Sequence, residues 1–219
     1  MRIAITGANS SVGHAFLNSL VNQTGNEITV NAGVRRQAAA DTLPDHPSIT
    51  PYVIQYGDSA SLEQLLDGAT CVVHLAGILI ESPSSNYQTA NIDATSAVVK
   101  AAQRAKLGQI VLVSALGANS LSTNGYYRSK GLAEDAVTAS GIPADIIRTP
   151  MLLGSGTAGA KGASRHGLTA VRQSAWRRRT GPTPVGRGRP NAGYSTMRPA
   201  RTAWYKHLRT CRPGTRHAP

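Results

Sequence analysis

The sequence predicts an α/β protein whose core is a doubly wound parallel sheet of about six strands. The first observation behind this prediction is that short apolar runs alternate with longer helical patterns along residues 1–154. The second is a glycine-bounded turn between the first apolar run and the first helical pattern. The third is an abrupt change of composition after Gly154, which separates a front part from a basic tail.

Six apolar runs have the length and composition of strands, and the continuous ones are typical of strands that are covered on both faces. The expected strands are Arg2–Thr6, Ile28–Val34, Tyr52–Tyr56, Cys71–Leu75, Gln109–Ser114 and Asp145–Arg148. Helices are expected over 12–20, with Gly25 as a stop, and over 61–66, 92–105 and 127–139. Strands and helices that alternate at this interval form βαβ units and a parallel sheet.

Charge is distributed unevenly along the chain. Residues 1–154 contain 9 Lys/Arg and all 11 Asp/Glu, whereas residues 155–219 contain 14 Lys/Arg and no acid. The net charge of +12 therefore comes from the tail, which excludes a uniformly basic DNA-binding domain. Leu, Ile, Val and Phe supply only four tail residues, too few to offset the entropy of ordering its backbone. We expect a folded domain over 1–154 and a disordered Arg/Gly/Pro/Ala-rich tail over 155–219.

Two interpretations of the tail are open. Arg, Ala, Gly and Pro have G+C-rich codons, and the loss of every acid at one point favours out-of-frame sequence. Alternatively, this basic segment, with its interleaved Trp and Tyr residues, binds nucleic acid or another polyanion by counterion release and stacking.

Several classes of protein and site are disfavoured. Cys71 and Cys211 are too few for a disulfide framework or a four-ligand zinc site, and no metal site is expected. Cys71 lies in an apolar run, where a small buried residue is expected. No run approaches the ~18 apolar residues of a membrane span. Strand-like sequence begins at Arg2, so we expect no signal peptide and a cytoplasmic location.

The turn between the first strand and the first helix predicts a dinucleotide site. Gly7 permits a tight exit from the strand, and Gly13 permits close packing of the helix on the sheet. Ser10 replaces the middle glycine of the usual fingerprint and narrows the approach without closing it. The backbone N–H groups of the turn, including Asn9, Ser11 and Val12, and the helix N-terminus form an anion site for a pyrophosphate.

Residues after the second and third strands bear on the choice of nucleotide. Arg35 and Arg36 follow the second strand, where an acid favours NAD and an arginine accommodates the 2′-phosphate of NADP. NADP is therefore favoured, with NAD as the alternative. Asp58 follows the third strand, where its carboxylate accepts from an adenine amino group, caps the next helix, or does both.

A set of motifs, taken in order and spacing, resembles the short-chain dehydrogenase/reductase superfamily over residues 1–154. The similarity is greatest to its atypical branch, the NAD(P)-binding Rossmann proteins similar to NmrA and to the 39-kDa-type complex I subunit. The motifs are TGANSSVG at 6–13, GDS at 57–59, HLAG at 74–77, Asn91, VLVSALGAN at 111–119, YYRSK at 126–130 and IIRTP at 146–150. The resemblance implies that Ala76, Gly77 and Asn91 also line the cofactor. His74 is expected to be a cofactor-edge or core histidine rather than a base.

The same resemblance implies a catalytic Tyr-x-x-x-Lys pair, here Tyr126 and Lys130, which one helical turn places on the same face. The Lys130 ammonium is expected to favour the Tyr126 phenolate and to hold the nicotinamide ribose. Ser114 either supplies the hydroxyl that polarises a substrate carbonyl or only lines the cofactor. In epimerase-like relatives that hydroxyl stands two positions later, where this chain has Leu116.

The sequence thus favours an NAD(P)-binding oxidoreductase that transfers hydride between NADP(H) and a small carbonyl or quinone-like substrate. The first alternative is a non-catalytic dinucleotide-binding sensor or assembly subunit. The second is a nucleic-acid or polyanion binder that acts through the basic tail, if the tail is genuine.

Overall fold

The structure, a computed structural model, describes residues 1–22 and 28–150. Strands and helices alternate in it as the sequence predicts, and the elements that were not predicted are the short helix α2 and the π-helix η1. In chain order the elements are β1 (Arg2–Thr6), α1 (Ser11–Val21), β2 (Thr29–Val34), α2 (Gln37–Ala40), β3 (Ile49–Val53), α3 (Ser59–Leu66), β4 (Cys71–His74), η1 (Gln88–Asp93), α4 (Ala94–Arg104), β5 (Gln109–Ala115), α5 (Gly125–Thr138) and β6 (Ala144–Thr149).

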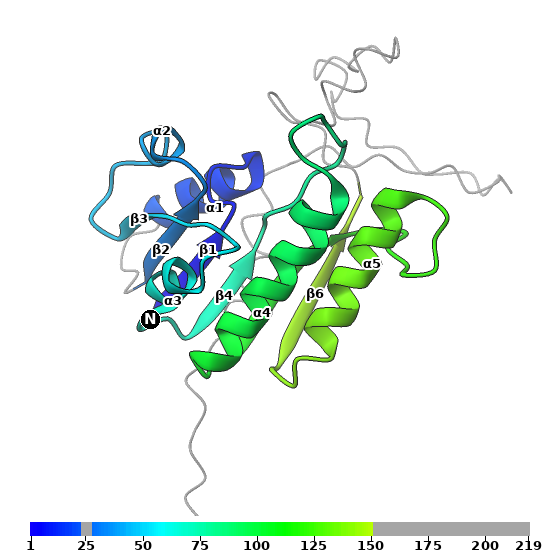
Figure 1. The fold of residues 1–219 in the computed structure, drawn as a ribbon. Helices are drawn as coiled ribbons and strands as arrows, with labels where there is room; N and C mark the ends of the chain where they lie inside the picture. Colours follow the sequence, from blue (N-terminus) through cyan, green and yellow to red (C-terminus); the bar gives the residue numbers. More distant parts are fainter. Residues whose placement is uncertain (23–27, 151–219) are drawn as a thin grey trace, which may run out of the picture. The chain divides into compact units, whose positions relative to one another are not determined.

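The strands form one sheet of six in the order β3-β2-β1-β4-β5-β6, and every pair is parallel. The chain builds outward from β1 through β2 to β3, and then returns to place β4 on the other side of β1 (Figure 1). The predicted doubly wound parallel sheet is confirmed. Because the strands are parallel, their carboxyl ends share one edge, and the reversal between β1 and β4 is where such sheets bind ligands.

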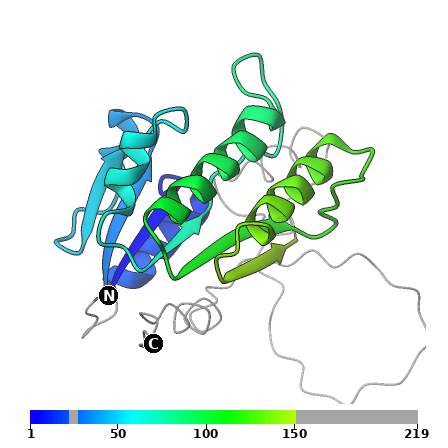
Figure 2. The same cartoon turned by 60° about the horizontal axis from the view of Figure 1, so that its bottom comes forward.

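Helices cover both faces of the sheet. Ile3 and Ile5 of β1 pack in one buried cluster with Leu17 of α1, whereas Ala4, between them, belongs to the opposite cluster. That opposite cluster contains buried residues of α3, α4 and α5, and Figures 1 and 2 show these three helices over the same face of the sheet. The alternation along β1 explains why its sequence is apolar throughout. Cys71 is buried in the first cluster, as expected from its apolar neighbours.

The third strand lies earlier than predicted. It was expected at 52–56 because Tyr52, Ile54 and Tyr56 form an apolar pattern, but β3 pairs with β2 over Ile49–Val53. A proline disfavours a central strand, so Pro51 argues against a strand that begins at Ile49. Because β3 is an edge strand, the proline is tolerated there. Ile54 is still buried, which accounts for the apolar residues just beyond the strand.

The helix expected over 92–105 begins earlier, as the π-helix η1 that leads into α4. Its first residues, Gln88, Thr89 and Ala90, lack apolar spacing, so hydrophobic periodicity gave no sign of them. The Thr95 hydroxyl donates to the Asn91 carbonyl at 2.6 Å, across the junction of the two helices. The wide turn therefore holds Asn91 at the end of the helix that faces the carboxyl edge of the sheet.

The expected stop at Gly25 and the expected disordered tail at 155–219 lie outside the described residues. Within 1–22 and 28–150, no helix has the length and apolar character needed to cross a membrane.

Candidate functional site

The turn between β1 and α1 is built from backbone contacts. Gly7 leaves the strand with a φ of 72°, a conformation that glycine adopts without strain. The Ala8 N–H donates to the Gly33 carbonyl at 3.1 Å, and the Ser10 N–H donates to the Gly7 carbonyl at 3.0 Å. Ser10 also caps α1, because its hydroxyl accepts the Gly13 N–H at 3.0 Å. A Cβ on Gly13 would lie 2.2 Å from the Ala8 carbonyl oxygen, so glycine is required there.

This turn leaves N–H groups for a ligand. With the N–H groups of Ser10 and Gly13 used inside the turn, those of Ser11 and Val12 have no acceptor among the residues described. They lie in the first turn of α1, where backbone donors and the helix dipole favour an anion. Asn9 and Ser11 are exposed beside them. The predicted anion site therefore has both the donors and the open backbone that it needs.

The end of β4 lies against the same turn. A Cβ on Gly7 would lie 2.8 Å from the Ala76 nitrogen, so the two backbones approach at van der Waals distance only because Gly7 has no side chain. A Cβ on Gly77 would lie 3.0 Å from the Asn91 Oδ1 and 3.9 Å from the Lys130 Nζ. The structure thus brings together, at one edge of the sheet, four predicted cofactor residues and the predicted catalytic lysine.

Arg35 and Arg36 follow β2 as predicted, and both side chains are exposed. The Gln55 side-chain amide donates to the Arg35 carbonyl at 3.4 Å, which ties this segment to the end of β3. The positive charge of Arg35 also acts to lower the pKa of Tyr56, although burial dominates and raises that pKa to about 12. Arg35 is therefore exposed between β2 and α2, and its contact with a 2′-phosphate stays a prediction.

Asp58 caps α3, since its carboxylate accepts the Ala60 N–H at 3.0 Å. The capping role proposed from the sequence is confirmed. The side chain is exposed, and a contact with an adenine amino group stays a prediction.

Asn91 is buried, and its side chain holds two segments together. Its Oδ1 accepts the Ile78 N–H at 2.7 Å, and its Nδ2 donates to the Ile78 carbonyl at 3.2 Å and to the Ser129 hydroxyl at 2.9 Å. The amide orientation is fixed, because a backbone N–H only donates and a carbonyl only accepts. Asn91 therefore positions the segment after β4 against α5 through contacts that use its whole amide.

Lys130 is a buried ammonium, with 7% of its surface exposed. Its Nζ donates to the Val113 carbonyl at 2.8 Å. Burial lowers the pKa of Lys130 to about 8, and the carboxylate of Glu134 partly offsets this by raising it. The next residue of β5, Ser114, is 3% exposed, and its hydroxyl has no hydrogen-bond partner among the described residues. A buried hydroxyl without a partner is a donor that a ligand can use, and it lies one residue after the carbonyl that Lys130 contacts.

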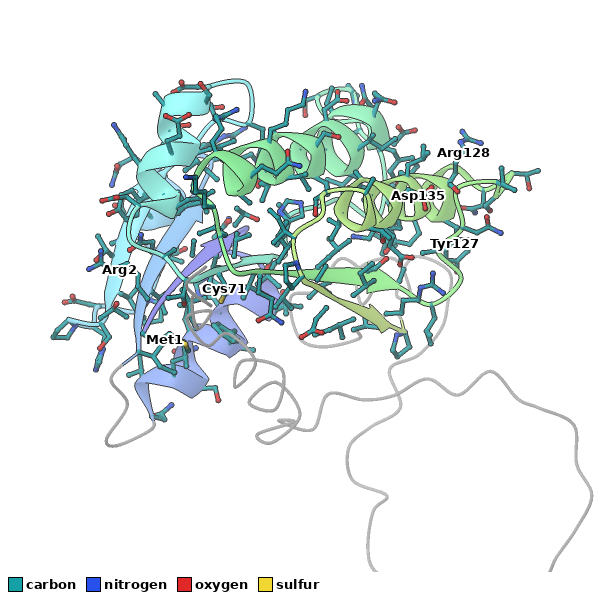
Figure 3. All side chains as sticks on the ribbon, turned by 90° about the horizontal axis from the view of Figure 1, so that it is seen from below. Met1, Arg2, Cys71, Tyr127, Arg128 and Asp135 are labelled. Carbon is teal, nitrogen blue, oxygen red and sulfur yellow. The ribbon has the colours of Figure 1, made fainter. Side chains whose placement is uncertain are left out.

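Tyr126 lies one turn before Lys130, at the start of α5, in a cluster of three tyrosines. Its ring centre is 6.0 Å from that of Tyr87 and 5.5 Å from that of Tyr127. Figure 3 shows Tyr127 and Arg128 at this end of α5, away from Met1 and Arg2 at the start of β1. The net pKa of Tyr126 runs opposite to the expected direction, whereas the effect of Lys130 on a phenolate stays a prediction. Burial raises the pKa of Tyr126, and Tyr127 and Tyr87 raise it further.

An ion pair lies behind the lysine. The Arg148 guanidinium of β6 donates from Nη2 to the Glu134 carboxylate at 2.5 Å and from Nε to its two oxygens at 3.0 and 3.2 Å. Glu134 is one further turn along α5 from Lys130 and is buried, whereas half of the Arg148 side chain is exposed. The pair joins β6 to α5 and leaves a carboxylate whose charge favours the Lys130 ammonium.

His74 is buried at the end of β4, as the sequence suggested for a core or cofactor-edge residue. Its ring contacts the hydroxyls of Thr6 at 2.6 Å and Thr95 at 3.1 Å. Burial, followed by the positive charge of Lys130, lowers the pKa of His74 to about 3. The imidazole is therefore neutral at physiological pH and unsuited to act as a general base in exchange with solvent.

Sequence reasoning missed Tyr87 and Gly131. Tyr87 lies just before η1, and its hydroxyl donates to the Leu79 carbonyl at 2.9 Å, which places its ring beside Tyr126. A Cβ on Gly131 would lie 2.1 Å from the Ser120 nitrogen, so the loop after β5 packs directly on the backbone of α5. The sequence contains one sign of the close packing at Gly131, namely a glycine within a helical pattern directly after the Tyr-x-x-x-Lys pair.

These residues fit a nicotinamide dinucleotide. The glycine turn supplies backbone donors for a pyrophosphate, and the buried Ser114 hydroxyl is available to a ligand because it has no partner among the described residues. The turn at 7–13 would hold the pyrophosphate, and the contacts of Arg35 with a 2′-phosphate and of Lys130 with the ribose on the nicotinamide side stay predictions.

Comparison with known proteins agrees with this fit. The chain matches the family described as NAD(P)H-binding over residues 7–178. It is 30% identical over 159 residues to the ceramide reductase of Caulobacter vibrioides, covering 70% of this chain and 47% of that protein. It is 28% identical to the NADPH-dependent quinone oxidoreductase QOR2 of Escherichia coli, solved with NADPH. That match has a TM-score of 0.56 and covers 76% of this chain and 55% of the other.

A more distant structure shares the fold. UDP-glucuronic acid 4-epimerase of Bacillus cereus, solved with NAD, is 19% identical, with a TM-score of 0.59, and the match covers 70% of this chain and 58% of that one. The chain thus spans about half the length of the ceramide reductase and slightly more of the two solved enzymes. With this family match, the Gly7–Gly13 turn and the six-stranded parallel sheet, the chain belongs to the NAD(P)H-binding family and is similar to the atypical short-chain dehydrogenases/reductases.

Proposed function

We propose that this protein is an NADP(H)-dependent reductase that transfers hydride to an apolar carbonyl or quinone-like substrate. The dinucleotide-binding domain in this proposal is residues 1–154, as the composition predicts. The names of two similar proteins, a ceramide reductase and an NADPH-dependent quinone oxidoreductase, support a reductase.

The observation that supports the proposal best is a buried, unpaired hydroxyl near the carboxyl end of β5, one residue after the carbonyl that Lys130 of α5 contacts. Ser114 has a buried, unpaired hydroxyl, and Lys130 donates to the carbonyl of the preceding residue, Val113. Tyr126 is one helical turn from Lys130 and is half-buried. An unpaired buried hydroxyl costs about 1–3 kcal/mol, which is expected where a ligand completes the hydrogen bonding.

The proton for the reaction comes from Tyr126. When bound, the nicotinamide supplies a hydride to the carbonyl carbon, and the carbonyl oxygen becomes negatively charged. The Tyr126 Oη–H bond then breaks as the proton forms a new O–H bond on that oxygen. Because burial and the neighbouring tyrosines raise its pKa, Tyr126 is protonated at neutral pH and ready to donate. The positive charge of Lys130 stabilises the phenolate as it forms.

Ser114 donates a hydrogen bond to the substrate oxygen in this mechanism. Epimerase-like relatives carry a hydroxyl at the position of Leu116, but that side chain is 55% exposed here and has no group that can donate. Ser114 is buried, and its hydroxyl is unused among the described residues, so it is the candidate that replaces the missing one.

The surroundings of Tyr126 favour an apolar substrate. Of the six large apolar residues that are exposed in the described part of the chain, four lie in the segments around Tyr126. They are found after β4, after β5 and at the start of α5, and they are Ile80, Leu116, Leu121 and Tyr127. Exposed apolar residues in the segments near a site favour an apolar ligand.

Exchange of two neighbouring tyrosines tests the proposal. The full chain is assayed for NADPH oxidation with menadione and with a long-chain aliphatic ketone, as the unchanged protein, Tyr126→Phe and Tyr127→Phe. Tyr126→Phe should lower kcat by about 10²–10⁴-fold, because it removes the proton donor, with little change in NADPH affinity. Tyr127→Phe keeps the ring that packs on Gly117 and should stay within about 3-fold of the unchanged protein.

The other outcomes are equally informative. Equal turnover by both variants would remove Tyr126 from the mechanism. NADPH binding without oxidation of NADPH by either probe would favour the dinucleotide-binding sensor or assembly subunit.

A further inference from the structure

A chain of buried polar side chains connects the dinucleotide turn with α5, and the mechanism above does not use it. Thr6, the last residue of β1, contacts Nδ1 of His74, and Nε2 of His74 contacts Thr95 of α4. Thr95 donates to the carbonyl of Asn91, and Asn91 in turn donates from its side chain to Ser129. All five residues are buried, with at most 2% of the surface of each exposed.

The direction of each hydrogen bond in this chain can be deduced. The Asn91 carbonyl only accepts, so the single hydroxyl proton of Thr95 is directed to it. Thr95 must then accept from His74, which places a proton on Nε2. A neutral imidazole has one N–H, so Nδ1 is an acceptor and receives the hydroxyl proton of Thr6.

Neutrality of the ring follows from its surroundings. Burial first, and then the ammonium of Lys130, lower the pKa of His74 to about 3. The aromatic ring of Tyr56 meets the imidazole edge-on at 6.3 Å. Lys130 is cationic and Tyr56 is a neutral phenol. Neither group supplies the negative charge that would stabilise an imidazolium at His74.

We propose that His74 is a positioning residue whose imidazole, protonated at Nε2 alone, couples the dinucleotide turn to Asn91 and to the helix that carries Tyr126. The coupling role rests on the proposed function, whereas the protonation state does not. His74 touches none of the proposed reacting groups and acts through Thr95 and Asn91.

The mechanical consequence is local. Thr6 directly precedes Gly7, so the ring is held by the strand from which the anion-binding turn begins. On the other side, the Asn91 side chain hydrogen-bonds with both backbone groups of Ile78 and with the Ser129 hydroxyl. Ser129 donates to the Tyr126 carbonyl at 2.8 Å. A change in the His74–Thr95 contact therefore moves the segment after β4 and the first turn of α5, and leaves the glycine turn in place.

Nitrogen NMR tests the protonation state. The full chain, labelled with ¹⁵N-histidine, is measured from pH 5 to 8, and the His74 signals are assigned by their loss in His74→Asn. The expected signature is a neutral ring with Nε2–H and an unprotonated Nδ1 throughout this range. Titration of His74 within it, or an Nδ1–H ring, would overturn the proposal.

Thr95→Val and Thr95→Ser form a matched pair for the same measurement. Valine has nearly the shape of threonine but cannot accept from Nε2, so the His74 proton should shift wholly or partly to Nδ1, where Thr6 accepts it. Serine keeps the hydroxyl and should keep the Nε2–H ring. An unchanged ring in the valine variant would show that Thr95 does not set the tautomer and would overturn the proposal.

Nucleotide titrations test the coupling. We expect Thr95→Val to weaken NADPH binding about 5-fold, the size of one lost hydrogen bond, and Thr95→Ser to stay within about 2-fold. Both should bind adenosine 2′,5′-bisphosphate, which lacks the nicotinamide half, as the unchanged protein does. If Thr95→Val does not fold, Thr95→Ala compared with Thr95→Ser provides the same test, because alanine also lacks an acceptor for Nε2.

The possible failures are distinguishable. Equal losses for both probes would indicate a general structural defect and overturn the coupling role. If the unchanged protein binds no NADPH, the proposed function fails and the coupling role fails with it, even where the Nε2–H signature is found.

Discussion

The half of the domain that contains the glycine turn and the half that contains Tyr126 differ in how many polar side chains they bury. Ten polar side chains are buried in the described residues, and only Thr6 and Asn31 come from the half formed by β1, β2 and β3. The other eight come from β4 onward, and they include the ammonium of Lys130 and the unpaired hydroxyl of Ser114.

The difference shows that binding and chemistry place different demands on the fold. The nucleotide turn needs backbone N–H groups and space, which glycines supply within eight consecutive residues, 6–13. The proposed chemistry needs a proton donor and charges away from water, and the residues involved are spread over β5, α5 and β6. The first half therefore costs little free energy of folding, whereas the second half buries polar and charged groups whose burial opposes folding.

Glycine-to-alanine exchanges give the largest expected effect, because a methyl group has no room in either half. A Cβ would lie 2.2 Å from a backbone oxygen at Gly13 and 2.1 Å from a backbone nitrogen at Gly131. Each alanine should lower the free energy of unfolding by about 3 kcal/mol, measured by urea denaturation. Gly13→Ala should also abolish binding of adenosine 2′,5′-bisphosphate, whereas Gly131→Ala should retain it and lose turnover.

Gly57 provides the control for both variants. A Cβ there has nothing within 4 Å, and the residue has no positive φ, so Gly57→Ala should be neutral or slightly stabilising. Loss of nucleotide binding in both Gly13→Ala and Gly131→Ala would break the distinction between the two halves.

Removal of the buried charge in the second half should increase stability. The unfolded Lys130 keeps its proton to about pH 10.5, but the folded one only to about pH 8. Below pH 8 the protein therefore carries the full penalty of the buried ammonium, and between pH 8 and 10.5 the penalty is relieved. Lys130→Met should raise the free energy of unfolding by about 2 kcal/mol at pH 7, with the advantage shrinking toward pH 10.

Lys100→Met is the matched control, because Lys100 is exposed on α4. It should change the free energy of unfolding by less than about 0.5 kcal/mol at either pH. A Lys130→Met protein that is less stable than the unchanged protein at pH 7 would show that the hydrogen bond to the Val113 carbonyl outweighs the cost of burial.

The smallest expected effect concerns the choice of nucleotide in the first half. Arg35→Asp should weaken NADPH binding about 10-fold and leave NADH binding similar or slightly tighter, because a carboxylate repels a 2′-phosphate and accepts from a ribose hydroxyl. Fluorescence titration of both nucleotides measures the ratio, with Arg36→Asp as the comparison at the neighbouring exposed position. Equal losses for NADPH and NADH would contradict the assignment of Arg35 to the 2′-phosphate.

The sequence predicted the first half better than the second. The glycine turn could be found because its residues are contiguous and because the backbone geometry at Gly7 and Gly13 requires glycine. The strands were found from apolar runs, apart from β3, where Pro51 obscured the register.

The second half depended on resemblance and on contacts between distant segments. The pair of Tyr126 and Lys130 was found from its motif, but the pKa of Tyr126 was predicted in the wrong direction. Its environment depends on Tyr87, almost forty residues earlier in the chain, and on its own burial, neither of which periodicity reveals. Likewise, the unpaired state of the Ser114 hydroxyl depends on what packs around it.

The sheet order also has a consequence for the order of folding. Each half joins strands that are near one another in the chain, but the two halves meet where β1 pairs with β4, and Thr6 and His74 lie 68 residues apart. Contacts of long sequence separation close late and slowly, since loop entropy must be overcome first. The glycine turn can therefore form early, whereas the edge on which Ala76 meets Gly7 exists only after β1 and β4 have paired. Full nucleotide affinity should thus appear in the last kinetic phase of refolding.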